Sequence, residues 1–319
     1  MRAFALAGAA GLVSLALAAA PAQASVVLEQ WSAGPFTAQI AVRAGDANGD
    51  GKADLVGVNT TGYGSYVKLS TGSAFQNQVN WGAGGIQQVE WYDHFVADAD
   101  GDGRADLLEV GPNFGPYMAK SKTDIYGTDW FWTPTTWVSA VMQGQDRSLA
   151  ADMNGDGLTD IIGLFYARIQ VSLSTPTGGQ QPVTWAAWVR GENATLAADA
   201  NGDDKADLVL VDDTGVRVIV TGTNRWYDTP AQWTTRPFSG TKKTLTADID
   251  GDGDADLIAV NDTDVQVMHS TGTTYTAPET WYTGAFAGTK ETLTADVDGD
   301  GDADLVAVND NDVWVLRTQ

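Results

Sequence analysis

Apolar residues along this chain come in short runs that are separated by Gly, Asn, Asp and Thr, and the runs recur in one order. A short alternating run leads into an acidic loop, and an apolar run such as DLVGV or DLIAV leaves it. An alternating run such as VQVMHS or VWVLR comes next, and a segment with a tryptophan ends the unit. Short runs bounded by turn residues predict β-strands, and no stretch beyond residue 24 shows helical periodicity. The pattern therefore predicts an all-β chain with four strands per unit.

The acidic loop is a nine-residue segment, such as DANGDGKAD or DVDGDGDAD, that occurs six times. Its copies follow one another at intervals of about 50 residues, a spacing typical of arrays and propellers whose units cannot bury their apolar faces alone. Four strands per repeat is the anatomy of a propeller blade. The six copies begin at Asp46, Asp98, Asp152, Asp199, Asp248 and Asp296.

Oxygen-bearing side chains occupy positions 1, 3, 5 and 9 of every loop, and glycine at position 4 permits a tight turn. A hard cation that prefers six to eight oxygen ligands suits this arrangement, which predicts up to six Ca²⁺ ions, one per blade. A single loop of this kind could be a solvated acidic turn, but six at near-regular intervals favour metal. The candidate metal residues, at positions 1, 3, 5, 7 and 9, are Asp46, Asn48, Asp50, Lys52, Asp54, Asp98, Asp100, Asp102, Arg104, Asp106, Asp152, Asn154, Asp156, Leu158, Asp160, Asp199, Asn201, Asp203, Lys205, Asp207, Asp248, Asp250, Asp252, Asp254, Asp256, Asp296, Asp298, Asp300, Asp302 and Asp304.

The two ends of the chain predict how the ring closes. A tryptophan precedes each loop by 14 to 17 residues, so the chain opens with a tryptophan segment and stops one strand after the last loop. VWVLRTQ is then a third strand without a fourth, and VVLEQWS is a fourth strand without a blade. Pairing the two leaves no open sheet edge. We therefore expect a six-bladed β-propeller, since seven blades would require a degenerate unit.

The pattern D-x-[DN]-G-D-G-x-x-D, followed by an aliphatic strand, resembles the integrin-like FG-GAP or VCBS repeats. The resemblance covers essentially all of the chain beyond residue 24. It implies a Ca²⁺-loaded β-propeller with the metal loops between the first and second strands of each blade. The fourth copy departs from the pattern, because Asp204 stands where the others have Gly. We expect this residue to strain the turn or to add a carboxylate.

The N-terminal sequence and the composition also predict where the protein is located. Residues 1–24 combine a basic start at Arg2, an apolar run and an A-x-A end, as a secretory signal does, which leaves residues 25–319 as a single propeller. No other apolar run is long enough to span a bilayer, so we expect a secreted, extracellular protein without membrane insertion. The chain has no cysteine. Ring closure and metal must then stabilise it without disulfides.

The net charge of −23 reflects the loops more than the rest of the chain. The six loops hold 24 of the 41 acidic residues, and the remaining acids nearly balance the 18 basic ones. The acidity is therefore the expected ligand sphere of the metals and not a field that steers a basic partner. No basic stripe exists to neutralise phosphates, so we expect no nucleic-acid partner.

In related propellers the face opposite the metal loops carries the blade-joining loops, and ligand binding is expected there. Aromatic rings can stack on sugars while nearby polar groups bind hydroxyls, as in other ligand sites. Two near-duplicate segments, 232–245 and 280–293, offer such groups, and so does EWYDHF at 90–95. The candidate ligand residues are Trp91, Tyr92, His94, Trp188, Arg236, Phe238, Lys242, Tyr282, Phe286 and Lys290.

These observations favour a lectin-like protein that binds a glycan or polysaccharide through several weak sites on a rigid ring. A protein-binding module for adhesion, or a subunit of a secreted complex with another secreted or cell-surface protein, is the alternative. A polysaccharide lyase or hydrolase could use Glu90, Asp93 and His94, but no matching second cluster is evident and no catalytic residues are predicted. Phe238 and Phe286 could also pack between blades instead of binding a ligand.

Overall fold

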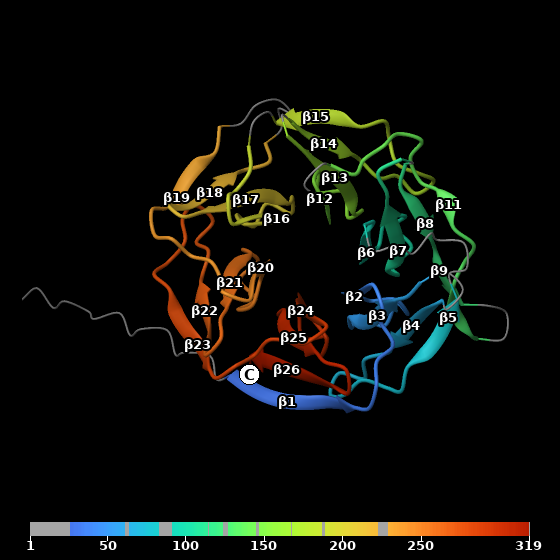
Figure 1. Ribbon diagram of the computed structural model, residues 1–319. Helices are drawn as coiled ribbons and strands as arrows, with labels where there is room; N and C mark the ends of the chain where they lie inside the picture. The colour runs from blue at the N-terminus through green and yellow to red at the C-terminus, as the bar shows by residue number, and fades with distance from the viewer. Residues whose placement is uncertain are drawn as a thin grey trace, which may run out of the picture.

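The computed structural model is a closed ring of six β-sheets around a central axis (Figure 1). Across the part of the chain that is described, every regular element is a strand, and no helix is long and apolar enough to cross a membrane. The predicted all-β propeller is therefore confirmed. The described residues are 26–60, 64–82, 91–113, 115–123, 127–144, 147–166, 168–186, 189–222 and 229–318.

Each blade is an antiparallel four-stranded sheet whose first strand lies innermost and whose fourth lies at the rim (Figure 1). Blade 1 contains β2 (Ala41–Gly45), β3 (Asp54–Val58), β4 (Ser65–Lys68) and β5 (Val79–Gly82). Blade 2 contains β6 (Asp93–Ala97), β7 (Asp106–Val110), β8 (Tyr117–Ala119) and β11 (Thr135–Thr136). Blade 3 contains β12 (Arg147–Ala151), β13 (Asp160–Phe165), β14 (Arg168–Ser172) and β15 (Val183–Ala186).

The remaining three blades repeat this order. Blade 4 contains β16 (Ala194–Ala198), β17 (Asp207–Asp212), β18 (Gly215–Ile219) and β19 (Ala231–Thr234). Blade 5 contains β20 (Lys243–Ala247), β21 (Asp256–Val260), β22 (Asp264–Met268) and β23 (Glu279–Thr283). Blade 6 contains β24 (Glu291–Ala295), β25 (Asp304–Val308), β26 (Asp312–Thr318) and β1 (Val26–Ala33).

The second strand of each blade is its most buried element, because both of its faces pack against neighbouring blades. All five residues of β3 are buried, as are those of β7, β21 and β25. This burial explains why these strands read as continuous aliphatic runs and do not alternate. The tryptophan series packs between blades, as the contact between Trp31 and Phe75 shows, with ring centroids 5.5 Å apart.

Strand β1 closes the ring, as predicted. It pairs antiparallel with β26 from Val26 opposite Thr318 to Ala33 opposite Asp312, with one bulge between Gln30 and Ser32. The last blade therefore has the order β1-β26-β25-β24, and its outermost strand comes from the other end of the chain (Figure 1).

Blade 2 carries an insertion that sequence reasoning did not resolve. Strands β9 (Ser121–Thr123) and β10 (Asp129–Phe131) form a hairpin between its third and fourth strands. The hairpin lies against blade 1, where Phe131 pairs with Gly82 and extends that sheet to six strands. The insertion accounts for the long interval between Trp81 and Trp137. Phe131 is buried, whereas its neighbours Trp130 and Trp132 are 40 % and 47 % exposed.

Candidate functional site

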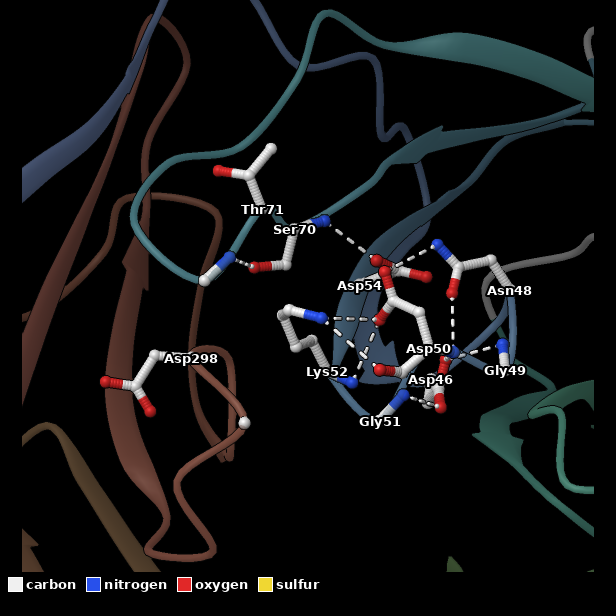
Figure 2. A network of polar contacts seen from close by, with 12 residues as sticks. Asp46, Asn48, Gly49, Asp50, Gly51, Lys52, Asp54, Ser70, Thr71 and Asp298 are labelled. Carbon is white, nitrogen blue, oxygen red and sulfur yellow. Dashed lines mark hydrogen bonds and ion pairs between the residues drawn. The ribbon is translucent and has the colours of Figure 1, made fainter.

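The acidic loops join the first and second strands of every blade and share one conformation. In the first loop the Asp46 carboxylate accepts hydrogen bonds from the amides of Gly49 and Gly51, both at 2.7 Å (Figure 2). The amides at positions 4 and 6 bind the first aspartate in the same way in the second, third, fifth and sixth loops. The fold therefore presents one oxygen-rich geometry six times on one face of the ring.

This conformation requires left-handed backbone at positions 4 and 6. Gly49 and Gly51 have φ of 76° and 83°. Asp204 occupies position 6 of the fourth loop with φ of 65°, and it is the one non-glycine residue with positive φ in the described ranges. Aspartate tolerates this region better than most residues but less well than glycine. The strain expected at Asp204 is therefore present, and its amide still binds the Asp199 carboxylate at 2.7 Å.

The ninth residue of each loop is a buried aspartate held by main-chain donors. Asp54 accepts from the amides of Ser70 at 2.8 Å and Ala47 at 3.1 Å. Burial raises the pKa of Asp54 to about 7, and it raises the pKa of Asp106 to about 8. Asp106 Oδ2 is buried and accepts no hydrogen bond. A cation in the loop would supply the missing partner and favour the charged carboxylate.

Several of these clusters could hold a metal ion. The carboxylate oxygens come within 4.8 Å of one another in Asp98, Asp100 and Asp106, in Asp248, Asp250 and Asp252, and in Asp296, Asp298 and Asp300. Position 7 is different, because Arg104 donates to Asp129 at 2.7 Å and Lys52 lies 3.4 Å from Asp50. The side chains at that position are cationic or apolar in four loops, so only their main-chain carbonyls could serve as ligands there.

Hydrogen bonds join neighbouring loops into a circle. The amide at position 8 of each loop donates to the carbonyl at position 1 of the preceding one. Ala105 donates to Asp46 at 2.7 Å, and the same bond recurs at each of the next four junctions. Ala53 closes the circle by donating to Asp296 at 2.8 Å. The six loops are therefore one connected layer and not six independent turns.

A residue at the end of the third strand, or directly after it, matches the charge at loop position 3. Three loops have Asn there, and the matching residues are aliphatic: Asn48 with Leu69, Asn154 with Leu173 and Asn201 with Val220. The other three have Asp, and each is ion-paired with a cation: Asp100 with Lys120, Asp250 with His269 and Asp298 with Arg317.

This matching keeps the loop charge constant. The hydrogen bond to Asp256 raises the pKa of His269 to about 9, so the imidazole carries its charge at neutral pH. When the side chains at positions 1, 3, 5 and 9 are counted as ionised and the matched residue is added, every loop has a formal charge of −3. Sequence reasoning missed these matched residues, although the alternation of Asn and Asp at position 3 was a visible signal.

The two duplicated junction segments do not present aromatic ligand platforms. Phe238 and Phe286 are only 5 % and 4 % exposed, so the expectation that they stack on a ligand is corrected to packing in the core. Tyr282 lies edge-on against Phe286 with ring centroids 6.3 Å apart. Lys242 pairs with Asp262 at 2.7 Å, and Lys290 pairs with Asp310 at 3.1 Å. Arg236 is exposed.

The segment that begins at Trp91 is divided between surface and core. Trp91 is 69 % exposed and Tyr92 is half-buried, but His94 is only 1 % exposed and points toward Glu109, with Nε2 3.8 Å from Oε1. His94 is therefore a core residue and not a ligand-binding group. Three of the predicted features lie outside the described residues: Trp188, Glu90 and the expected signal sequence at 1–24.

A second exposed aromatic residue, Tyr166, was not among the candidate ligand residues. Tyr166 follows β13 at the end away from the loops and is also 69 % exposed. Gln143 donates to the Trp91 carbonyl at 2.7 Å, and a Cβ on the adjacent Gly144 would overlap the Leu164 carbonyl. The segment around Gln143 thus lies against Trp91 and against Leu164, which is two residues before Tyr166.

The same face opens into two adjoining cavities at the inner strands. Cavities of about 470 Å³ and 540 Å³ share Arg147 and Lys243 in their linings. Glu291 accepts from Lys243 at 2.7 Å and lies 3.4 Å from Arg43. The lining of these two cavities therefore contains both basic and acidic side chains, although the chain as a whole is strongly acidic.

The FG-GAP-like repeat family matches residues 199–259 and 248–307. The chain thus contains FG-GAP-like repeats, and its six blades are consistent with an FG-GAP-repeat propeller. No curated protein matches the chain.

Solved structures share the fold at low sequence identity. A Tc holotoxin pore of Photorhabdus luminescens aligns over 92 % of this chain and 14 % of its own, with TM-score 0.62 and 20 % identity. This chain therefore spans about one seventh of that toxin chain. An Agrocybe aegerita lectin that recognises non-reducing terminal N-acetylglucosamine aligns over 90 % of this chain and 86 % of its own, with TM-score 0.52 and 17 % identity. A Xanthomonas campestris gluconolactonase aligns over 92 % and 90 %, with TM-score 0.51 and 10 % identity.

Proposed function

We propose that this chain is a secreted, calcium-loaded propeller that binds glycans on the face opposite its metal loops. The observation that carries the calcium part is the recurrence of one oxygen-rich loop in all six blades, each with a formal charge of −3 when its matched residue is included. Every side-chain donor at positions 1, 3, 5 and 9 is an oxygen, which suits Ca²⁺ better than softer metals. Extracellular Ca²⁺, on the order of millimolar, is sufficient for loops of modest affinity.

The glycan part is supported by the exposed aromatic residues Trp91 and Tyr166. Both lie at strand ends away from the loops, and the Gln143 segment lies against Trp91 and against Leu164 of the strand that leads to Tyr166. Large exposed aromatic residues beside polar groups are typical of ligand sites. A lectin with the same fold recognises a sugar, which makes the proposal reasonable although the low identity transfers no binding residues.

A glycan array probed with Ca²⁺-loaded protein tests this function. The double variant Trp91→Ala/Tyr166→Ala should lose binding by roughly 1–3 kcal/mol, the value of removing a large apolar contact. Trp130→Ala/Trp132→Ala is the matched control, because it removes two exposed aromatic residues from the rim and should leave glycan binding unchanged. A parent protein that binds no glycan, or a double variant that binds like the parent, would contradict the proposal.

Protein binding is the second candidate, and the inserted hairpin favours it. Trp130 and Trp132 form an edge-to-face pair with ring centroids 5.1 Å apart, and Lys122 lies 5.5 Å from the centroid of the Trp132 ring. Exposed Trp with a nearby cation is typical of binding hot spots. Two results together would favour this second function. The parent protein would bind no glycan, and Trp130→Ala/Trp132→Ala would abolish its capture of a protein from culture medium.

A further inference from the structure

His269 gives the fifth loop a chemistry that the other five lack. Its Nδ1 atom lies 3.1 Å from Asp250 Oδ2 and 3.1 Å from Asp256 Oδ2. Its Nε2 atom lies 3.2 Å from Glu279 Oε1, on the outer strand of the same blade. The imidazole therefore faces two loop carboxylates with one nitrogen and a third carboxylate with the other.

The matched residues of the second and sixth loops cannot act as metal ligands near neutral pH. Lys120 and Arg317 pair with Asp100 and Asp298, but ammonium and guanidinium groups keep their protons at neutral pH and only donate. An imidazole nitrogen can instead give up its proton and bind a metal through its lone pair. Among the three matched cations, His269 alone can exchange a proton for a metal ion near neutral pH.

The distances in the fifth loop suit a small metal ion. The ligand atoms of Asp250, Asp256 and His269 lie within 4.8 Å of one another. Adjacent ligands of a tetrahedral Zn²⁺ with bonds of about 2.0–2.1 Å are roughly 3.3 Å apart. Both nitrogen-to-oxygen distances are close to that separation. Glu279 on the second nitrogen is the partner that metal-bound histidines usually have, and it orients Nδ1 toward the loop.

We propose that the fifth loop binds a transition-metal dication of the Zn²⁺ type through Asp250, Asp256 and Nδ1 of His269. On binding, the Nδ1 proton passes to solvent and the metal occupies the space between the three side chains. Because two of its ligands also belong to the calcium loop, Zn²⁺ and Ca²⁺ compete in this blade. In the other loops an aliphatic residue, a lysine or an arginine replaces His269, so these loops offer only oxygen ligands and remain the proposed calcium sites.

The composition of the chain leaves few other side chains that could bind Zn²⁺. The chain contains no cysteine and two histidines, and the other histidine, His94, is only 1 % exposed. A Zn²⁺ titration of tag-free protein in competition with a chromophoric chelator should reveal one equivalent of tight binding. The ¹⁵N resonances of the His269 imidazole should shift on Zn²⁺ addition, while those of His94 stay in place.

Two variants separate a metal ligand from a counter-ion. His269→Lys keeps the positive charge that Lys120 provides in blade 2 but removes the ligand, so Zn²⁺ affinity should fall at least tenfold while the melting temperature in Ca²⁺ is retained. Glu279→Gln should weaken Zn²⁺ binding about 10- to 100-fold, as loss of an outer carboxylate does. The site is overturned if the parent binds no Zn²⁺, if His269→Lys binds it equally well, or if the His269 resonances do not move. Ca²⁺-dependent stability is measured separately, so failure of this site leaves the calcium loops untouched.

Discussion

The amide of Ala53 donates a hydrogen bond to the carbonyl of Asp296 across 2.8 Å, although 243 positions separate the two residues. This bond joins the first acidic loop to the last. The same bond links each of the other five pairs of neighbouring loops. A conformational change in one loop can therefore be transmitted to the next through the main chain.

Calcium removal should destabilise the whole ring. Without the cation, the clustered carboxylates repel one another, and the free energy from binding only the native state is lost. One site saturated at 100 times its Kd contributes about 2.7 kcal/mol, so several such sites should raise the melting temperature by many degrees. Thermal unfolding with excess Ca²⁺ and with a chelator measures this. Equal melting temperatures would show that the loops are not calcium sites.

Relief of the strained turn should stabilise the fourth blade. Asp204→Gly places the residue that left-handed backbone favours at φ of 65° and should raise the free energy of unfolding by roughly 0.5–1 kcal/mol. Gly157→Asp is the matched control at position 6 of the third loop, where φ is 82°, and should lower it by a similar amount. Urea unfolding in saturating Ca²⁺ provides the values. A destabilised Asp204→Gly variant would show instead that the Asp204 side chain has a favourable role.

The matched charge at loop position 3 should be measurable in a double-mutant cycle. Asn48→Asp alone adds a carboxylate opposite Leu69 and should lower stability in chelator by several tenths of a kcal/mol. Adding Leu69→Lys, which reproduces the pairing of Asp100 with Lys120, should recover part of that loss. Additive effects of the two substitutions would mean that the cation does not act on the carboxylate at position 3.

His94 should make stability depend on pH. Burial, with a contribution from Arg43, lowers the pKa of His94 from 6.5 to about 4. The unfolded chain therefore binds the proton first, so stability is full above about pH 6.5 and is lost as the pH falls toward 4. The shift corresponds to about 3 kcal/mol at most. The free energy of unfolding should change less between pH 7 and pH 5 for His94→Gln than for the parent. Equal differences would mean that His94 is charged in the folded state.

Removal of β1 tests ring closure. Deleting residues 26–33 exposes the full edge of β26 and uncovers core residues that Trp31 packs against, including Phe75. Such an edge pairs readily with other chains. The truncated protein should elute as aggregates in size-exclusion chromatography and melt earlier. A monomer of parental stability would contradict closure by this strand.

The sequence was informative where one local pattern repeats, and less so where contacts depend on distant segments. Loops and second strands could be predicted because position 9 is followed directly by the buried run, as at Asp54 and Leu55. Closure by β1 followed from counting strands. The burial of Phe238 and Phe286 could not be read from their segments, because neighbouring blades cover them.

Two further features needed the three-dimensional structure. The hairpin at Trp130 appeared only as an irregular interval, since nothing local shows that Phe131 packs against Trp81 of another blade. The pairing of His269 with Asp250 joins residues 19 positions apart through strand register, and the sequence places them on separate elements.

The pairing of β1 with β26 also sets the order in which this protein can be completed. Strand β1 precedes every other described strand in the chain and β26 follows them, so β1 has no sheet to join until β26 has emerged from the ribosome. Blades in between can form from local contacts, but the ring stays open throughout synthesis and its long-range closure comes last. If the chain is exported before it folds, as we propose, this late closing step is an advantage, because the ring cannot close ahead of its passage.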